Sequence, residues 1–150
     1  MRDNQYLIVL LEAIWNRYFA DVPRVNKVSI RFGKHSYRQL GAIKSKRGDD
    51  SESKIVLTRF FMSPEIPEHV LISTIAHEIV HYSHGFNSPL PKLYSDPHRG
   101  NIVEKDLTKR GLEKELTLSK QWLKENWSII VTPRLSQRRR LRRRFLIFSF

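Results

Sequence analysis

Residues 77–81 read His-Glu-Ile-Val-His, and this pentapeptide is the most informative stretch of the chain. On an α-helix, positions i and i+4 lie one turn apart on the same face, so His77 and His81 can direct two imidazoles at one ion. Glu78 follows about 100° around the helix, within reach of a water molecule on that ion. This spacing is typical of zinc hydrolases in which the glutamate is the general base. It predicts His77 and His81 as zinc ligands and Glu78 as the catalytic residue.

The residues around the pentapeptide favour a long, largely buried helix. No Gly or Pro interrupts residues 70–82, and their apolar side chains are spread over a broad face. Pro64 and Pro67 suit a first helical turn, with Ser63 as its N-cap, and Gly85 suits a C-terminal stop. Polar side chains on a buried helix need partners, because unpaired polar groups cost free energy. A bound metal ion meets that need.

A catalytic zinc site has a third protein ligand and leaves one position open. His98 follows a proline-containing loop and opens a helical stretch over 100–112, so the returning chain can lie beside the metal helix. We therefore expect His98 as the third ligand. Glu104 is the alternative. His84, one turn beyond His81, is expected at the rim of the site.

Hydrophobic periodicity predicts an α+β domain. The last of three expected strands leads directly into the metal helix, so we expect it to be the edge strand that lines the cleft and pairs with a peptide. This order is typical of a zincin-like fold with a small antiparallel sheet. The expected elements are a helix at 5–19 capped by Asn4, strands at 27–33, 37–44 and 54–61, a polar loop at 47–53, the metal helix, helices at 100–112 and 116–127, and a short strand at 128–132.

Composition limits the class of protein. The chain has 150 residues, enough for one domain with a sizeable core. It has no cysteine, which excludes disulfides, cysteine nucleophiles and cysteine-ligated metals. The first 18 residues read as an amphipathic helix rather than a signal peptide, and no stretch approaches the roughly 20 apolar residues of a membrane span. We expect a cytoplasmic protein.

Positive charge is concentrated at the C-terminus. The net charge is +12, and residues 134–150 supply seven arginines and no acid. We therefore divide the chain into a domain, 1–133, and an arginine-rich tail, 134–150. Such a tail favours non-specific nucleic-acid binding, with arginines on phosphates and Phe145, Phe148 and Phe150 stacking on bases. The alternative is a solubilising tail, or a helix that docks Leu141 and Phe145 on the core. The arginines of the block are Arg138, Arg139, Arg140, Arg142, Arg143 and Arg144.

The chain resembles the SprT-like zinc metallopeptidase family over about residues 5–112. Three stretches carry the resemblance. Residues 40–58 contain a Leu-Gly pair and a polar loop leading into a strand, residues 70–82 contain the metal helix, and residues 98–111 contain His98, an apolar residue four positions later and a Gly further on. Arg99 and Ile102 depart from the family pattern, and the absence of cysteine means that the family's zinc ribbon is missing.

The resemblance implies a zinc-dependent endopeptidase with His77, His81 and His98 as ligands, Glu78 as base, and a polypeptide substrate. Because the family includes Spartan-type proteases that act on proteins crosslinked to DNA, it also implies DNA-bound substrates. The alternative function is a basic nucleic-acid-binding protein with a structural or vestigial metal site. A third reading is a membrane-associated or partner-docking module acting through 134–150. The oxyanion-stabilising residue stays open among Tyr82, His84, Tyr94 and Arg99.

Overall fold

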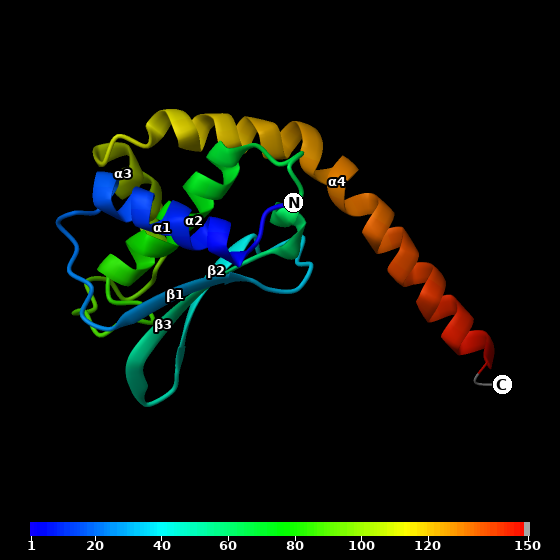
Figure 1. The fold of residues 1–150 in the computed structure, drawn as a ribbon, viewed down its shortest axis with the longest axis horizontal. Coiled ribbons are helices and arrows are strands. Elements are labelled where there is room, and N and C mark those ends of the chain that lie inside the picture. The colour runs from blue at the N-terminus through cyan, green and yellow to red at the C-terminus, as the bar shows by residue number, and fades with distance from the viewer. Residues whose placement is uncertain (149–150) are drawn as a thin grey trace.

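Four α-helices and a three-stranded sheet follow one another along the described part of the chain, which confirms the α+β prediction. The structure is a computed structural model that describes the backbone of residues 1–148 and the side chains of residues 1–142. The elements are α1 (Asn4–Tyr18), β1 (Lys27–Phe32), β2 (Gly41–Lys46), β3 (Asp49–Leu57), the 3-10 turn η1 (Arg59–Met62), α2 (Glu68–Ser83), the 3-10 turn η2 (Arg99–Asn101), α3 (Ile102–Lys109) and α4 (Glu113–Phe148) (Figure 1).

The sheet is mixed, so the prediction of an antiparallel sheet was wrong. The strand order is β1-β3-β2, with β1 parallel and β2 antiparallel to β3. Ile55 of β3 is opposite Ile30 on one side and Ile43 on the other. The strand predicted at 54–61 is therefore the central strand, and its prediction as the cleft edge was also wrong. The backbone hydrogen-bonding groups of β3 are paired with β1 on one side and β2 on the other, so β2 is an edge strand of the sheet.

The polar stretch at 47–53 is mostly strand rather than loop. Arg47 and Gly48 alone separate β2 from β3, and Gly48 has a φ of 75°, which glycine adopts without steric cost. The first residues of β3 are exposed, because this end of the hairpin extends beyond the helices that cover the sheet (Figure 1). Polar composition therefore indicated solvent exposure here and not the absence of a strand.

Helix α2 lies at the centre of the domain, and most of its side chains are buried. It contacts α1, α3, α4 and the sheet. The helix starts at Glu68, with Pro67 at the N-cap position, so the predicted cap at Ser63 was wrong. Ser63 instead ends η1, a turn that buries Phe60 and Phe61. Similarly, Asp3 rather than Asn4 caps α1, by accepting a hydrogen bond from the Tyr6 N–H.

Helix α4 crosses the domain beside α2 and then continues away from it (Figure 1). The short strand predicted at 128–132 is part of this helix, because Val131 is buried while Ile129 is 68% exposed, a helical rather than an alternating pattern. The Ser119 hydroxyl contacts that of Ser73 at 2.8 Å, and the Trp127 indole N–H donates to the Tyr37 carbonyl at 2.8 Å. Among the described residues, no helix is long and apolar enough to span a membrane.

Tyr82 joins α2 to the start of the sheet. Its ring is fully buried and packs edge-on against Trp15, with ring centroids 5.4 Å apart. The hydroxyl donates to Asn26 Oδ1 at 2.7 Å and accepts from the Val25 N–H at 3.1 Å. These bonds fix the residues that lead into β1, so Tyr82 has a structural role.

We expect Tyr82→Phe to lower the free energy of unfolding by about 1–2 kcal/mol, because two part-buried hydrogen bonds of its hydroxyl, to the Val25 N–H and to Asn26 Oδ1, are lost. Urea unfolding followed by circular dichroism measures this loss. Tyr37→Phe, at an exposed side chain, serves as the control and should change stability little. Equal stability of the Tyr82→Phe and wild-type proteins would contradict the assigned role.

Candidate metal centre

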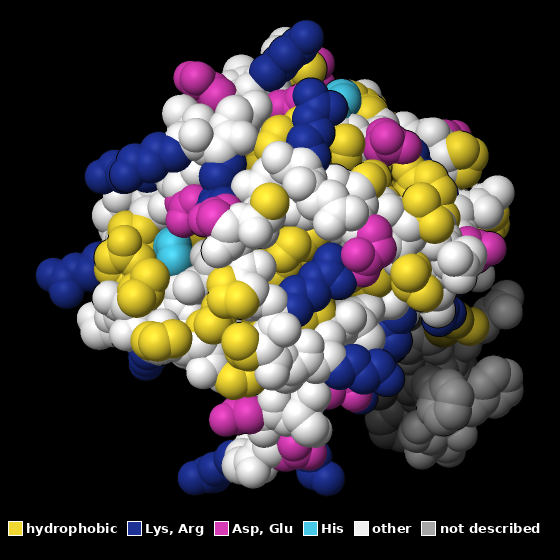
Figure 2. Space-filling model, turned by 60° about the vertical axis from the view of Figure 1, so that its left-hand side comes forward, with side chains coloured by type: hydrophobic (Ala, Val, Ile, Leu, Met, Phe, Trp, Pro, Cys, Tyr) yellow, Lys and Arg dark blue, Asp and Glu magenta, His cyan; other side chains and the backbone are white. Residues whose placement is uncertain are grey.

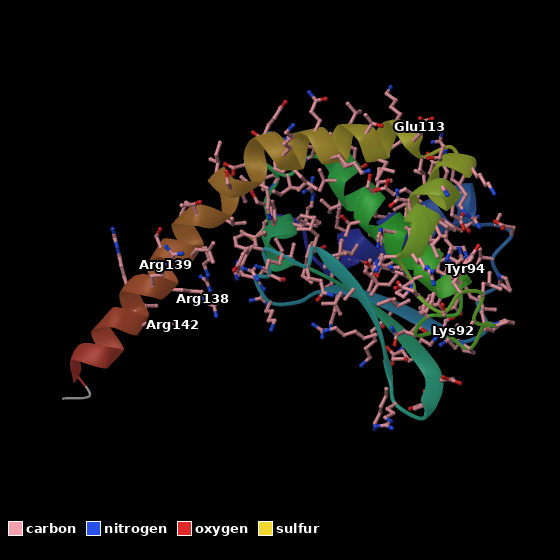
Figure 3. The ribbon with its side chains drawn as sticks, turned by 180° about the vertical axis from the view of Figure 1, so that it is seen from behind. Lys92, Tyr94, Glu113, Arg138, Arg139 and Arg142 are labelled. Carbon is pink, nitrogen blue, oxygen red and sulfur yellow. The ribbon has the colours of Figure 1, made fainter. Side chains whose placement is uncertain are left out.

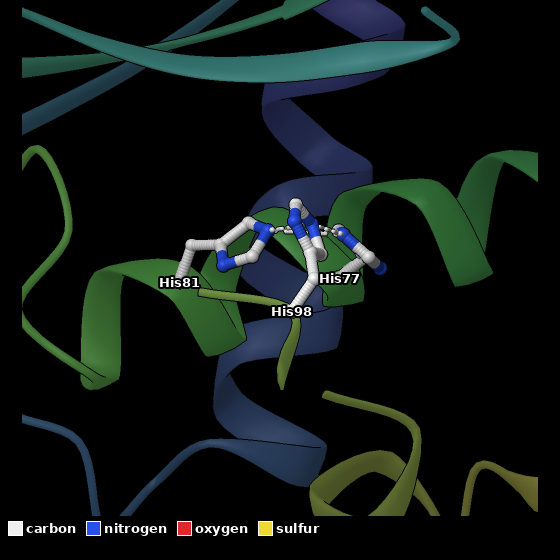
Figure 4. A group of neighbouring side chains, drawn as sticks. All are labelled: His77, His81 and His98. Carbon is white, nitrogen blue, oxygen red and sulfur yellow. Dashed lines mark hydrogen bonds between the residues drawn. The ribbon is translucent and has the colours of Figure 1, made fainter. Parts of the chain in front are cut away.

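Three imidazoles converge at one point on the surface of α2 (Figure 4). His77 and His81 lie one turn apart on this helix, and His98 comes from the segment just before η2. The Nε2 atom of His81 lies 3.0 Å from that of His77 and 3.0 Å from that of His98. The Nε2 atoms of His77 and His98 are 3.3 Å apart. The three histidines lie close enough to bind one metal ion.

A tight turn directs His98 toward α2. The backbone N–H of His98 donates to Asp96 Oδ1 at 2.9 Å. The two residues that follow Arg99, Gly100 and Asn101, have φ values of 68° and 55°, so the chain reverses before α3 begins. Glycine adopts such angles freely, and asparagine does so more readily than most residues. The sequence predicted that a loop return would place His98 beside the metal helix, and the structure has it there.

The chemistry of the three side chains fits a metal ion. Burial lowers the pKa of His77 to about 4 and that of His81 to about 3, so both rings are neutral near pH 7 and can offer a lone pair. Three imidazole nitrogens at mutual contact cannot all be satisfied by hydrogen bonds to one another, whereas one cation can accept all three lone pairs. A tetrahedral ion about 2.0–2.1 Å from each nitrogen separates them by about 3.3–3.4 Å. The observed separations, 3.0–3.3 Å, are close to that value.

Glu78 lies beside this cluster but is not a member of it. Its side chain is 5% exposed, and burial raises its pKa to about 7, while a hydrogen bond from the Ile43 backbone acts in the opposite direction. Strand β2 therefore lies close to this carboxylate. A Cβ atom on Gly41 would lie 2.7 Å from Thr74 Cγ2 and 3.4 Å from Glu78 Oε1, so only glycine lets the strand approach α2 this closely.

The cluster opens into a cleft of about 440 Å³ between β2 and α2. The three histidines and Glu78 line it, together with residues that the sequence analysis did not identify. Gly41 could have been found from the Leu-Gly pair before the strand. Ala42 and Ile43 on β2 and Thr74 on α2 belong to no recognisable motif, and the remaining residues lie outside the helices and strands. The additional lining residues are Arg38, Gln39, Leu40, Gly41, Ala42, Ile43, Thr74, Phe86, Asn87 and Pro97.

Glu104, the alternative third ligand, lies outside the histidine cluster. Its carboxylate forms an ion pair with Lys120 of α4 at 2.6 Å. None of the four residues considered for oxyanion stabilisation lines the cleft. Tyr82 is bound to the residues before β1, and the buried His84 pairs with Asp106 at 2.8 Å. The Tyr94 ring packs edge-on against that of His84 with centroids 4.9 Å apart, and Arg99 is exposed.

Comparison of the chain with protein-family models, curated proteins and solved structures gives no match. The features that indicate a function are the motif at residues 77–81 and the geometry of the cleft.

We expect the protein to bind one zinc ion per chain and His98→Ala to weaken that binding strongly. Loss of a direct ligand should exceed the roughly 10–100-fold effect of losing a partner of a ligand. Elemental analysis after dialysis and competition with a chromophoric chelator measure both quantities. The matched control is Glu104→Ala, which should keep its zinc. A Glu104→Ala protein that loses zinc while His98→Ala retains it would reverse the assignment of the third ligand.

Proposed function

We propose that this protein is a zinc-dependent endopeptidase with a zincin-like fold. The observation that carries the proposal is the convergence of three imidazole nitrogens beside a buried carboxylate, in a cleft bordered by an edge strand. The spacing of His77, Glu78 and His81, which the SprT-like metallopeptidases would share, favours the same reaction. His77, His81 and His98 would hold the ion.

The number of ligands favours a catalytic over a structural ion. Structural zinc sites are usually closed by four protein ligands. Among the described residues the cluster contains three, and all three line the open cleft. The chain has no cysteine to complete a closed site. A position facing the cleft is thus available to water or substrate.

Glu78 carries the proton transfer in this proposal. Zinc, when bound, would acidify a water molecule and polarise the carbonyl of the scissile peptide bond. One Glu78 carboxylate oxygen accepts the proton of the attacking water and then delivers it to the nitrogen of the leaving amine. The backbone N–H of Ile43 lowers the pKa of this carboxyl group and so favours the charged form that accepts the proton. Burial of Glu78 limits its access to bulk water, so the proton stays at the reacting atoms.

The edge strand β2 supplies the place for a polypeptide. Gly41, Ala42 and Ile43 of this strand line the cleft directly opposite the histidines of α2. An extended peptide can add to a free sheet edge through backbone hydrogen bonds, whatever its sequence. Such pairing would lay a peptide carbonyl across the metal centre, and this supports a polypeptide rather than a small molecule as the substrate.

We expect Glu78→Gln to keep the fold and the zinc but to lose roughly 10²-fold or more of the peptidase activity, because an amide cannot accept the proton. Cleavage of an unstructured protein such as casein, normalised to zinc content, measures this loss. Glu65→Gln, at an exposed acid on the segment before α2, should retain activity. Undiminished cleavage by zinc-loaded Glu78→Gln would rule out Glu78 as the base.

A second candidate function, nucleic-acid binding, is favoured by the outer part of α4. Arg138, Arg139 and Arg142 are exposed on the segment of this helix that extends beyond the domain (Figure 3). No acidic residue follows Glu125 in the sequence. Arginines four apart on a helix repel each other, so an anionic partner would stabilise this segment. By contrast, lysines and arginines on the face in Figure 2 are scattered between acidic and apolar side chains.

Leu141 is 55% exposed, so it does not dock on the core. The side chains of Arg143, Arg144, Phe145, Phe148 and Phe150 lie outside the described residues, and their predicted contacts with phosphates and bases stay predictions. The two functions are compatible, because an arginine-rich arm could deliver a peptidase to protein bound on DNA.

We expect the triple variant Arg138→Gln, Arg139→Gln, Arg142→Gln to bind single-stranded DNA more weakly than the wild type. The slope of log affinity against log salt should fall by about 0.7 for each arginine that contacts a phosphate. Fluorescence anisotropy with a labelled oligonucleotide at several salt concentrations measures both.

The matched control is Lys105→Gln, Lys109→Gln, Lys114→Gln, which removes two charges from exposed positions on α3 and one from α4. It should bind DNA almost as the wild type does. Truncation after Thr132 should weaken DNA binding as the arginine variant does. Equal DNA affinity of the truncated and full-length proteins at one ionic strength would show that the tail does not bind DNA.

A further inference from the structure

Near the metal centre, charged and polar side chains are joined by a chain of hydrogen bonds. Arg110, which ends α3, donates from Nη1 to Asp21 Oδ1 at 2.7 Å and to the Tyr18 carbonyl at 2.9 Å, where α1 ends. The same guanidinium donates from Nε to Asp106 Oδ1 at 2.6 Å. Asp106 Oδ2 in turn lies 2.8 Å from Nε2 of the buried His84. The chain therefore joins α1, α3 and the end of α2.

This chain connects the two segments that carry the metal-binding histidines. His84 caps α2, three residues after His81. Asp106 lies on α3, eight residues after His98. The bond between His84 and Asp106 is therefore a direct link from the helix that holds two of the imidazoles to the helix that follows the third.

Apolar contacts also hold α3 against α2, but they define its position less sharply. Val103 and Leu107 are almost fully buried at this interface. Their contribution is non-directional, so small shifts or rotations of α3 cost little. A charge-assisted hydrogen bond is short and depends on geometry, and Arg110 holds the other oxygen of the Asp106 carboxylate. This arrangement resists the sliding of α3 along α2.

Stability alone is a poor explanation for these ion pairs. The desolvation of buried charges largely offsets their attraction, so a buried ion pair often contributes little to the free energy of unfolding. His84 has 5% and Asp106 22% of its side chain exposed, so both have lost much of their hydration. A geometric role accounts for retaining charged groups at a site where apolar packing would serve stability equally well.

We propose that Asp106, through His84 and Arg110, is a positioning residue for the metal centre, because it fixes the location of His98 relative to His77 and His81. The inference rests on the proposed metal site. Asp106 does not touch the ion. It sets how closely the third imidazole approaches the other two, and therefore the affinity and the coordination geometry of the site.

The test is Asp106→Asn, which keeps the size of the side chain and removes its charge. The expected result is a zinc affinity about tenfold or more below that of the wild type. The visible absorption spectrum of the cobalt-substituted protein should also change, because it reports the ligand geometry. His84→Phe removes the same hydrogen bond from the side of α2 and should change both measurements in the same direction.

Two controls separate an effect on the position of His98 from an effect on the stability of the fold. Glu12→Gln removes an ion pair of similar length, because Glu12 binds Arg24 at 2.6 Å. Neither residue lies on α3, so the zinc affinity should stay unchanged. Leu11→Ala truncates a buried side chain on α1 and should cost about 2–5 kcal/mol of stability without altering the cobalt spectrum. Urea unfolding of each metal-free protein gives the comparison.

The outcomes are distinguishable. Wild-type zinc affinity and an unchanged cobalt spectrum in Asp106→Asn would overturn the positioning role and leave the metal centre intact. Failure of the wild type itself to bind zinc would overturn the metal centre. An Asp106→Asn protein that does not fold would also overturn the inference, because the ion pairs would then be required for folding rather than for position.

Discussion

Helix α2 packs against α1, α3, α4 and the sheet at the same time, and its burial determines where everything else can lie. Because its apolar side chains are covered on nearly every side, the polar face with His77, Glu78 and His81 is confined to the gap beside β2. The hydrophobic effect therefore fixes both the position and the orientation of the candidate ligands. The same burial removes water from Glu78 and His81 and shifts their pKa values in opposite directions.

The sequence predicted those features that depend on local periodicity. The spacing of His77, Glu78 and His81 follows from helix geometry alone, and His98 could be found because a loop return leads into the next helix. It did not predict the strand order, because the pairing of β1 with β3 joins residues far apart in the chain and no local pattern encodes it. The cleft residues Arg38 and Asn87 were missed for the same reason.

Helix α4 shows a different limit of local patterns. The β-branched run Ile129-Ile130-Val131-Thr132 suits a strand by intrinsic propensity, yet it lies in a helix. Its anchors are tertiary: Trp127 packs edge-on against Phe60 and Phe61 and binds the Tyr37 carbonyl. These contacts hold the inner part of α4 on the domain, and the arginine-rich outer part continues the same helix. Packing elsewhere in a helix thus overrides the preference of a four-residue segment.

The close approach at Gly41 has a consequence for the dimensions of the cleft. A methyl group there would lie 2.7 Å from Thr74 Cγ2 and 3.1 Å from Leu57 Cδ2, so either these side chains or β2 would have to move. Where β2 moves outward, the amide of Ile43 would withdraw from the Glu78 carboxylate and the cleft above the histidines would become deeper. A single hydrogen atom in place of a methyl group therefore sets the height of the strand over the helix. The depth of the cleft is determined by what residue 41 lacks rather than by any group it supplies.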